Sequence, residues 1–236
     1  MVEDYPGLVI RPVRASPAAD PQESALDIPG EQEAQVEVQI TPAVVFTEDL
    51  GQSILDLDER RSVSVVRLSS DRITDEDLEF LSELEGVHKL IIEGRRISDI
   101  GLEHLGEFEV LDELRLVGCS ITDDGLAELR NLKSLQTLWV NSPKLTGVGF
   151  TSLTDLSNLK SVYLSGSPIV DDGLQQIAKI ASIETMVLDG TKITDKGMQH
   201  LAELHRLKLL NVESTKVTPQ GVIDVQSKIR GVRILH

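Results

Sequence analysis

The sequence predicts an α/β solenoid, a stack of similar coils in which short strands alternate with short helices. A six-residue block similar to ITDDGL recurs every 24 residues in seven copies, without an insertion or a deletion. Within one copy, apolar residues alternate first with a period of two and then with a spacing of three. A constant period of this length is typical of repeat proteins, whose coils bury their apolar faces by stacking. The copies begin at Ile73, Ile97, Ile121, Leu145, Ile169, Ile193 and Val217.

The third copy shows the strand and the helix most clearly. Leu114 and Leu116 alternate with polar or outward positions, a period of two that predicts a strand with one side packed inward. After the turn, Leu126, Leu129 and Leu132 follow one another at three-residue spacing and line one face of a short helix. Each coil therefore contributes one strand and one helix to the stack.

Two further residue types recur inside the block. Glycine stands at its fifth position in six of the seven copies, which we explain by close passage of the backbone beside the neighbouring coil; Asp77 takes this place in the first copy. Aspartate at the third position suits a helix N-terminus, where it accepts from unpaired N–H groups, and in the fourth copy Gly147 replaces it. The predicted capping residues are Asp75, Asp99, Asp123, Asp171 and Asp195.

The complete third copy reads LDELRLVGCSITDDGLAELRNLKSL. This frame resembles the leucine-rich repeat family, and its ITDxGLxxL half is similar to repeats of bacterial proteins and of F-box substrate receptors. The resemblance covers residues 62–236, which hold seven repeats and a terminal strand that begins in VRILH. It implies a leucine-rich repeat solenoid with a concave parallel β-sheet and short helices on the convex side.

The N-terminal quarter of the chain differs from the repeats. Residues 1–33 combine five prolines with acidic residues and alanines, a composition that predicts disorder. Residues 34–61 contain the alternating stretch AQVEVQI and the amphipathic stretch TEDLGQSILDLDE, which predict a strand and a helix. We expect this pair to form the N-terminal cap that an open stack of coils needs.

Composition narrows the range of functions. The net charge is −16, and residues 1–60 hold 13 of the 39 acidic residues but only three basic ones. Such a chain lacks the basic footprint that nucleic-acid binding requires. It has no run of about 18 apolar residues and no signal-peptide pattern at its start, so we expect a soluble, cytoplasmic protein with no membrane partner. Its oligomeric state stays open.

No enzyme motif is present, and we expect no catalytic residue, cofactor or metal site. The sequence contains no P-loop, GxSxG, HExxH or CxxC pattern. The repeated aspartates occur once per coil beside a helix start, where capping explains them better than calcium binding. The single cysteine, Cys119, occupies a small-residue position of the repeat and is expected to point into the turns rather than to act as a nucleophile.

The remaining candidates are strand residues that point away from the core, because the fold does not dictate them. Adjacent parallel strands lie about 4.8 Å apart, so Arg115, Trp139 and Tyr163 are expected to form one patch. These residue types are the most enriched among interface hot spots. The alternative is a row that merely covers the sheet through stacking. The predicted partner-binding residues are Arg115, Trp139, Tyr163, Glu113, Asn141 and Val187, and the predicted polar rim is Glu93, Glu113, Asn141, Ser165, Asp189 and Glu213.

A second row of residues directly precedes the repeated block and is mostly basic. It holds five bases in seven copies, which fits either a solvated edge of the sheet or a site for an acidic partner, including the chain's own N-terminal segment. The basic members are Arg72, Arg96, Lys144, Lys192 and Lys216.

These observations favour a non-enzymatic scaffold that binds another protein or peptide on its concave sheet. The alternative, suggested by the resemblance, is a substrate-recognition subunit of a ubiquitin-ligase-like complex of the F-box type. Against it, residues 1–60 show no F-box-like helical segment, and the chain lacks the cysteine-rich repeats of many such receptors. An enzymatic role would require a catalytic domain that these residues do not provide.

Overall fold

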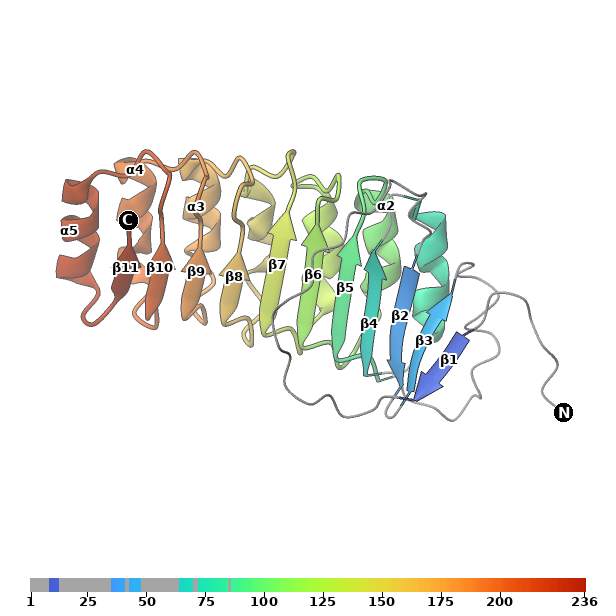
Figure 1. Ribbon diagram of the computed structural model, residues 1–236. Coiled ribbons are helices and arrows are strands. Elements are labelled where there is room, and N and C mark those ends of the chain that lie inside the picture. The colour runs from blue at the N-terminus through green and yellow to red at the C-terminus, as the bar shows by residue number, and fades with distance from the viewer. Residues whose placement is uncertain (1–8, 13–34, 41–42, 48–63, 70–71, 85) are drawn as a thin grey trace, which may run out of the picture.

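The computed structural model describes residues 9–12, 35–40, 43–47, 64–69, 72–84 and 86–236. One continuous sheet forms one side of the molecule, and a row of short helices covers its other side (Figure 1). The strands of the repeats follow one another in chain order across the sheet. This arrangement confirms the predicted α/β solenoid of strands and short helices.

Eight of the described strands are parallel, and each belongs to the start of a coil. Their spacing follows the 24-residue period, so that equivalent residues of successive coils pair directly, as Arg115 does with Trp139. The strands are β4 (Val65–Ser69), β5 (Lys89–Glu93), β6 (Glu113–Val117), β7 (Thr137–Asn141), β8 (Ser161–Tyr163), β9 (Thr185–Val187), β10 (Leu209–Asn211) and β11 (Arg233–Leu235). Strand β11 is the predicted terminal strand.

The helices are short, and most of them contain 3₁₀ turns. A 3₁₀ helix has three residues per turn, which explains why apolar residues recur at three-residue spacing in the third copy. The helices are η1 (Glu76–Glu83), α2 (Asp99–Leu102), η2 (Glu103–Leu105), η3 (Gly125–Asn131), η4 (Val148–Leu153), α3 (Asp171–Ile177), α4 (Asp195–Met198), η5 (Gln199–Glu203) and α5 (Pro219–Lys228).

Three antiparallel strands extend the sheet beyond β4. Strand β2 (Gln35–Ile40) pairs with β4 and with β3 (Ala43–Thr47), and β1 (Val9–Pro12) pairs with β3. The strand expected within 34–61 is therefore present, whereas β3 and β1 were not expected. The helix predicted after Thr47 and the remainder of 1–33 lie outside the described residues, and the domain boundaries remain predictions.

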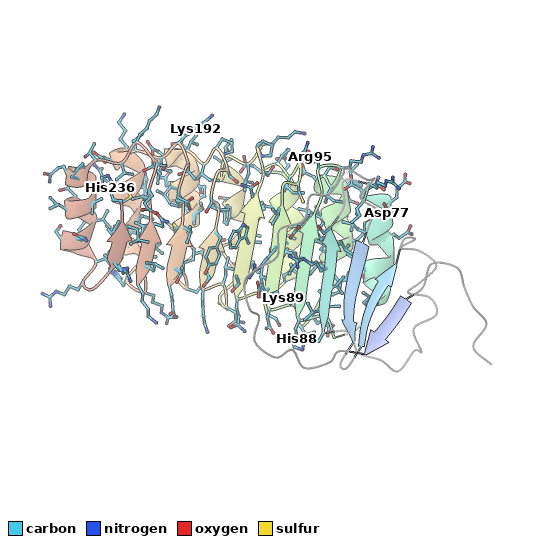
Figure 2. All side chains as sticks on the ribbon, viewed as in Figure 1. Asp77, His88, Lys89, Arg95, Lys192 and His236 are labelled. Carbon is cyan, nitrogen blue, oxygen red and sulfur yellow. The ribbon has the colours of Figure 1, made fainter. Side chains whose placement is uncertain are left out.

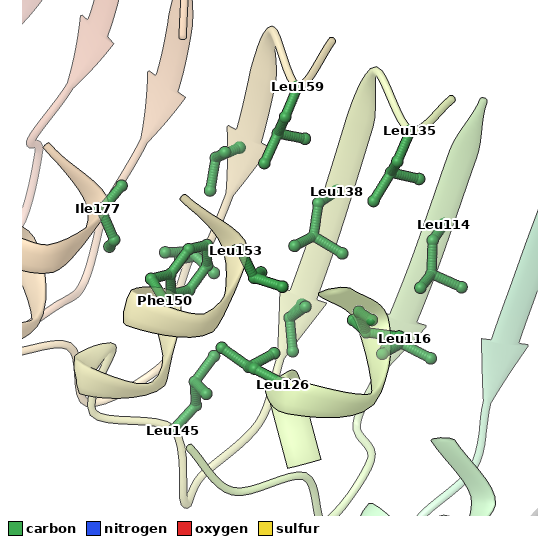
Figure 3. Packing of buried hydrophobic residues seen from close by; sticks show 14 of the residues in the cluster. Leu114, Leu116, Leu126, Leu135, Leu138, Leu145, Phe150, Leu153, Leu159 and Ile177 are labelled. Atoms are coloured by element: carbon green, nitrogen blue, oxygen red, sulfur yellow. The ribbon is translucent and has the colours of Figure 1, made fainter. Parts of the chain in front are cut away.

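The core lies between the sheet and the helices, and its buried residues extend from Val66 to Val232. Figure 3 shows part of this core. In each coil the inward strand residues meet the helix residues of the same and neighbouring coils. Leu114, Leu116 and Leu126 are completely buried, and Phe150 fills the position of Leu126 in the next coil. Burying one such side chain contributes about 1.5–3 kcal/mol, so each coil depends on its neighbours to cover these residues.

The repeated aspartates do not cap the helices of their own coils as predicted, because their carboxylates bind the next coil. Hydroxyl residues cap some of these helices: Ser98 accepts from the Ile100 N–H, and Thr194 accepts from the Lys196 N–H. Asp99 instead accepts from the Thr122 N–H at 2.8 Å and from the Thr122 hydroxyl at 2.6 Å. The prediction missed this contact because the two partners are 23 residues apart in the sequence.

We call each such contact between successive coils a carboxylate bridge. Asp123 makes the largest one, since it also accepts from the Gly147 and Gly149 N–H groups at 2.8 and 3.0 Å. At the last bridge, the N–H and then the hydroxyl of Thr218 hold the pKa of Asp195 below its ordinary value. The bridges are Asp75–Ser98, Asp99–Thr122, Asp123–Thr146, Asp171–Thr194 and Asp195–Thr218.

The recurring glycine leaves the space that the bridge occupies, as the sequence predicted in outline. A Cβ atom on Gly125 would lie 2.1 Å from Asp99 Oδ1. Asp77 can replace this glycine in the first copy because its own carboxylate accepts from the N–H and hydroxyl of Thr74, at 2.8 and 2.9 Å. The first coil thus makes within itself the contact that later coils make with a neighbour.

The fourth copy lacks the aspartate, and the coil after it lacks the hydroxyl. Gly147 has a φ of 95°, in the left-handed region, and Val170 stands where other coils have Ser or Thr. The Val170 N–H donates to the Thr146 carbonyl at 3.1 Å in place of a carboxylate. The two departures therefore compensate each other at one junction between coils.

We expect Asp123→Ala to lower the free energy of unfolding by about 2 kcal/mol, because three N–H groups and one hydroxyl lose a charged acceptor. Urea denaturation measures this loss. Asp124→Ala is the matched control, since Asp124 makes no side-chain capping bond and should change stability by less than about 0.5 kcal/mol. Equal losses in both variants would contradict the carboxylate bridge.

A second prediction tests whether the glycine is needed because the aspartate of the preceding coil occupies the space beside it. Gly125→Asp should destabilise the protein because it collides with Asp99, while Asp99→Gly removes the obstacle and leaves room for the new carboxylate to serve Thr122, as Asp77 serves Thr74. We expect the double variant to be more stable than the sum of the single effects by at least about 1 kcal/mol. Additive effects in a double-mutant cycle would refute this account.

Candidate functional site

The face of the sheet opposite the helices carries three parallel rows of side chains, one for each outward position of a strand. The central row is aligned residue by residue through the registers of neighbouring strands, as the sequence predicted. Of its members Arg67 is exposed and Ile91 is buried, and the others are partly exposed. The central row is Arg67, Ile91, Arg115, Trp139, Tyr163, Val187 and Asn211, continued by Leu235 on β11.

The middle of the central row is a stack of three side chains, which we call the aromatic stack. The rings of Trp139 and Tyr163 lie with centroids 4.9 Å apart and planes 13° apart. The guanidinium carbon of Arg115 lies 5.3 Å from the centroid of the Trp139 ring. Stacked aromatic pairs contribute about 0.5–1.5 kcal/mol, and an exposed cation over a ring contributes about 0.5–1 kcal/mol. The stack is therefore held in a defined shape before any partner binds.

Glu113 fixes one end of the aromatic stack. Its carboxylate accepts from Arg115 Nε and pairs with Lys89 Nζ at 3.2 Å. Glu113 belongs to the row near the start of the strands, where Figure 2 shows Lys89, whereas Glu93 belongs to the row near their ends. The predicted polar rim thus lies on both sides of the central row, and Glu113 positions Arg115.

Asn141 and Val187, the other predicted binding residues, have different surroundings. The amide of Asn141 donates to the Ser165 carbonyl at 2.7 Å, so part of this side chain is already used between strands. Val187 stands directly beside Tyr163 in the register and is partly exposed. The structure thus places both next to the aromatic stack, and their role in binding remains a prediction.

Three hydroxyl residues beside the aromatic stack were not among the predicted site residues. Thr137, Ser161 and Thr185 follow Glu113 along the row near the strand starts, and all three are partly exposed. Only their position in the sequence could have indicated that they belong to this surface, because each stands two residues before a member of the central row. They give the patch hydrogen-bonding groups on the side opposite Asn141.

The mostly basic row that precedes the repeated block lies beyond the C-terminal ends of the strands. Figure 2 shows Lys192 of this row and also Arg95, the residue before Arg96. Its lysines, Lys144, Lys192 and Lys216, are exposed. In three of the five copies with a basic residue, an aspartate of a carboxylate bridge follows that residue three positions later. This side of the sheet therefore carries both positive and negative charges. The mixture favours a solvated edge over a site for an acidic partner.

The structure gives Cys119 the surroundings of a structural residue. It is completely buried, and its Sγ lies 3.8 Å from the Ile92 carbonyl oxygen and 3.7 Å from that of Val117. Burial raises the pKa of the Cys119 thiol to about 11. Reactive cysteines have depressed pKa values and access to solvent, and Cys119 has neither.

Neither a metal site nor a membrane span is found in the part of the chain that the structure describes. No three side chains of the types His, Cys, Asp and Glu are gathered there to hold a metal ion. None of the described helices combines the length and the apolar character needed to cross a bilayer. The aromatic stack and its surroundings are therefore the surface on which a functional proposal can be based.

Comparisons with known proteins agree with this fold. The leucine rich repeat family profile matches residues 110–129, which hold most of the third copy. Comparison of the sequence with curated proteins gives no match. Among solved structures, the crystal structure of internalin C2 from Listeria monocytogenes is similar with a TM-score of 0.60 and 22% sequence identity, over 74% of this chain and 70% of that one. This likeness and the repeat geometry define a leucine-rich repeat solenoid.

Two further solved structures are similar to a lesser degree. An internalin (inlF) from Listeria monocytogenes has a TM-score of 0.44 and 20% identity, over 75% of this chain and 59% of that one. The ectodomain of the plant membrane receptor kinase GASSHO1/SCHENGEN3 from Arabidopsis thaliana, in complex with CASPARIAN STRIP INTEGRITY FACTOR 2, has a TM-score of 0.49 and 13% identity. That match covers 76% of this chain and 24% of the ectodomain.

We expect the Cys119 thiol of the folded protein to react at least about 100-fold more slowly with a disulfide reagent at pH 8 than in denaturing urea. Burial blocks access, and a pKa of about 11 leaves little thiolate at this pH. A colorimetric thiol assay measures both rates. Fast reaction of the folded protein would show that this turn opens readily and that Cys119 is not locked in the core.

Proposed function

We propose that the protein is a non-enzymatic scaffold that binds another protein or a peptide on the face of its sheet opposite the helices. The binding centre is the aromatic stack of Arg115, Trp139 and Tyr163, flanked by Glu113, Asn141 and Val187. The single observation that carries the proposal is the preformed stack at three outward positions. The buried core contains none of these side chains, so the fold alone does not require them.

The physical properties of the aromatic stack support this role. Trp, Tyr and Arg side chains often provide about 2 kcal/mol or more each when an interface removes them from water. Their order before binding lowers the conformational entropy that a partner would otherwise have to overcome. Hydroxyl and amide groups on both sides supply the polar surroundings typical of an interface.

The competing explanation is that the aromatic stack only stabilises the sheet. It predicts that changes in the stack alter stability and leave partner binding intact. The scaffold proposal predicts a much larger effect on binding than on folding. Both quantities therefore have to be measured on the same variants.

We expect Trp139→Ala to weaken partner binding at least about 30-fold, which corresponds to 2 kcal/mol, while the free energy of unfolding falls by about 1 kcal/mol through loss of the stack. Affinity capture from the source cell with the complete chain, followed by titration of the recovered partner, measures binding, and urea denaturation measures stability.

The control for this experiment is Val148→Ala, which removes an exposed apolar side chain at the start of η4. It should leave partner recovery unchanged. Equal recovery by Trp139→Ala and the unaltered protein would remove the proposed binding centre. Recovery of adaptor and cullin-like proteins would favour the F-box-type alternative, which no feature of the described residues specifically supports.

A further inference from the structure

We propose that the partner inserts a cationic side chain, arginine or lysine, beside Tyr163 and above Val187, next to the carboxylates of Asp189 and Glu213. This inference depends on the proposed function, because it names the partner chemistry that the same surface selects. It rests on the distribution of paired and unpaired charges across the sheet and on the shape of the central row at this point.

Acidic side chains over the first strands of the repeats are neutralised within the protein. Glu93 on β5 pairs with Arg67 at 3.2 Å and accepts from the Ser69 hydroxyl at 2.9 Å. Glu113 on β6 lies between Lys89 and Arg115 and pairs with both. This half of the sheet therefore presents few unsatisfied negative charges to a partner.

Asp189 and Glu213, which follow β9 and β10, are different. Asp189 accepts from the Ser165 hydroxyl at 2.6 Å, and Glu213 accepts from the Asn211 amide at 3.2 Å. Both of these donors are neutral. Among the described residues, no basic side chain forms an ion pair with either carboxylate. The negative charge at this end of the sheet is thus available to a ligand.

Asp189 and Glu213 also occupy equivalent positions on adjacent coils. Val187 and Asn211 are partners in the β9–β10 register, and the Gly190 N–H donates to the Glu213 carbonyl at 2.9 Å, so the alignment continues past the strand ends. Like charges directly opposite each other on adjacent strands destabilise a sheet. A cation between them would relieve this repulsion, which gives the position a preference for positive charge.

The central row leaves room for that cation. In the described part of the molecule, Tyr163 stacks on Trp139 alone, and its neighbour on the other side is the short side chain of Val187. Val187 has a shorter side chain than the rings, and among the described residues no ring or cation lies over the second face of Tyr163. A cation over the face of a tyrosine ring is attracted by its quadrupole.

The protein itself already contains a related arrangement at the opposite end of the stack. There Arg115 lies over Trp139 and is held by the carboxylate of Glu113, on the strand-start side of the central row. The proposed ligand side chain would lie over Tyr163 in the same way, but its carboxylates, Asp189 and Glu213, follow the strand ends. A guanidinium fits best because it can stack on the ring and donate to a carboxylate at once.

The test uses random 12-residue peptides displayed on beads and selected on the immobilised complete chain. Trp139 is the only tryptophan, so its fluorescence reports the binding of each selected peptide directly. The variant Asp189→Asn/Glu213→Gln removes both charges and keeps the size of each side chain. Asp172→Asn, which removes one exposed charge at the start of α3, is the control, and urea denaturation verifies that all proteins fold.

We expect the unaltered protein and Asp172→Asn to enrich peptides rich in arginine or lysine, and the double variant to bind them at least about 10-fold more weakly. Replacing the selected arginine by citrulline should cause a similar loss. Trp139-dependent selection of peptides without basic residues would overturn this inference and leave the scaffold proposal standing. Selection of no peptide, or selection that Trp139→Ala does not affect, would count against both.

Discussion

The carboxylate bridge between successive coils is the contact on which the rest of the structure depends. A single coil buries too few of its own apolar residues to be stable, so the stack holds together only if each coil sits at a fixed height above the last. An aspartate that accepts both an N–H and a hydroxyl of the next coil fixes this height and the rotation together. The glycine beside it is needed because its Cα approaches that carboxylate, and a Cβ on Gly125 would lie 2.1 Å from Asp99 Oδ1.

The fixed offset between coils has its main consequence on the sheet. Because neighbouring coils share one register, Arg115, Trp139 and Tyr163 come to lie on adjacent strands at the same level. The contact between the Trp139 and Tyr163 rings and the contact of Arg115 with Trp139 each join residues 24 positions apart in the sequence. A shift of one residue in the pairing register of a strand would move its outward side chains into the core. The constancy of the period therefore preserves the aromatic stack as well as the core.

The sequence was sufficient to predict the parts of the structure that follow from periodicity. The strands, the central row with Trp139 and the buried place of Cys119 follow from the repeated frame. The function of Asp99 could not be predicted in this way, because a carboxylate beside a helix start fits a local cap equally well and its true partner, Thr122, belongs to another coil. Strands β1 and β3 lie outside the repeats and pair antiparallel, so the 24-residue frame contains no information about them. The frame does contain the positions of Glu113 and Glu93, which stand two residues before and two residues after members of the central row, but the predicted polar rim did not separate these two positions.

The junction between the fourth and fifth coils connects the carboxylate bridges with the aromatic stack. It is the junction at which Gly147 and Val170 replace the carboxylate bridge by one backbone bond. The strands of the same two coils, β7 and β8, carry Trp139 and Tyr163, whose rings stack across the junction on the sheet side. A stacked pair is worth about 0.5–1.5 kcal/mol, which is comparable to the net value of an ordinary hydrogen bond. The aromatic stack can thus stabilise the junction that, among the described repeats, lacks a bridge. It can still bind a partner, because the Trp139–Tyr163 contact uses one face of Tyr163 and leaves its other face and the rims of both rings for binding. Stabilisation and recognition are therefore compatible roles for the same two rings.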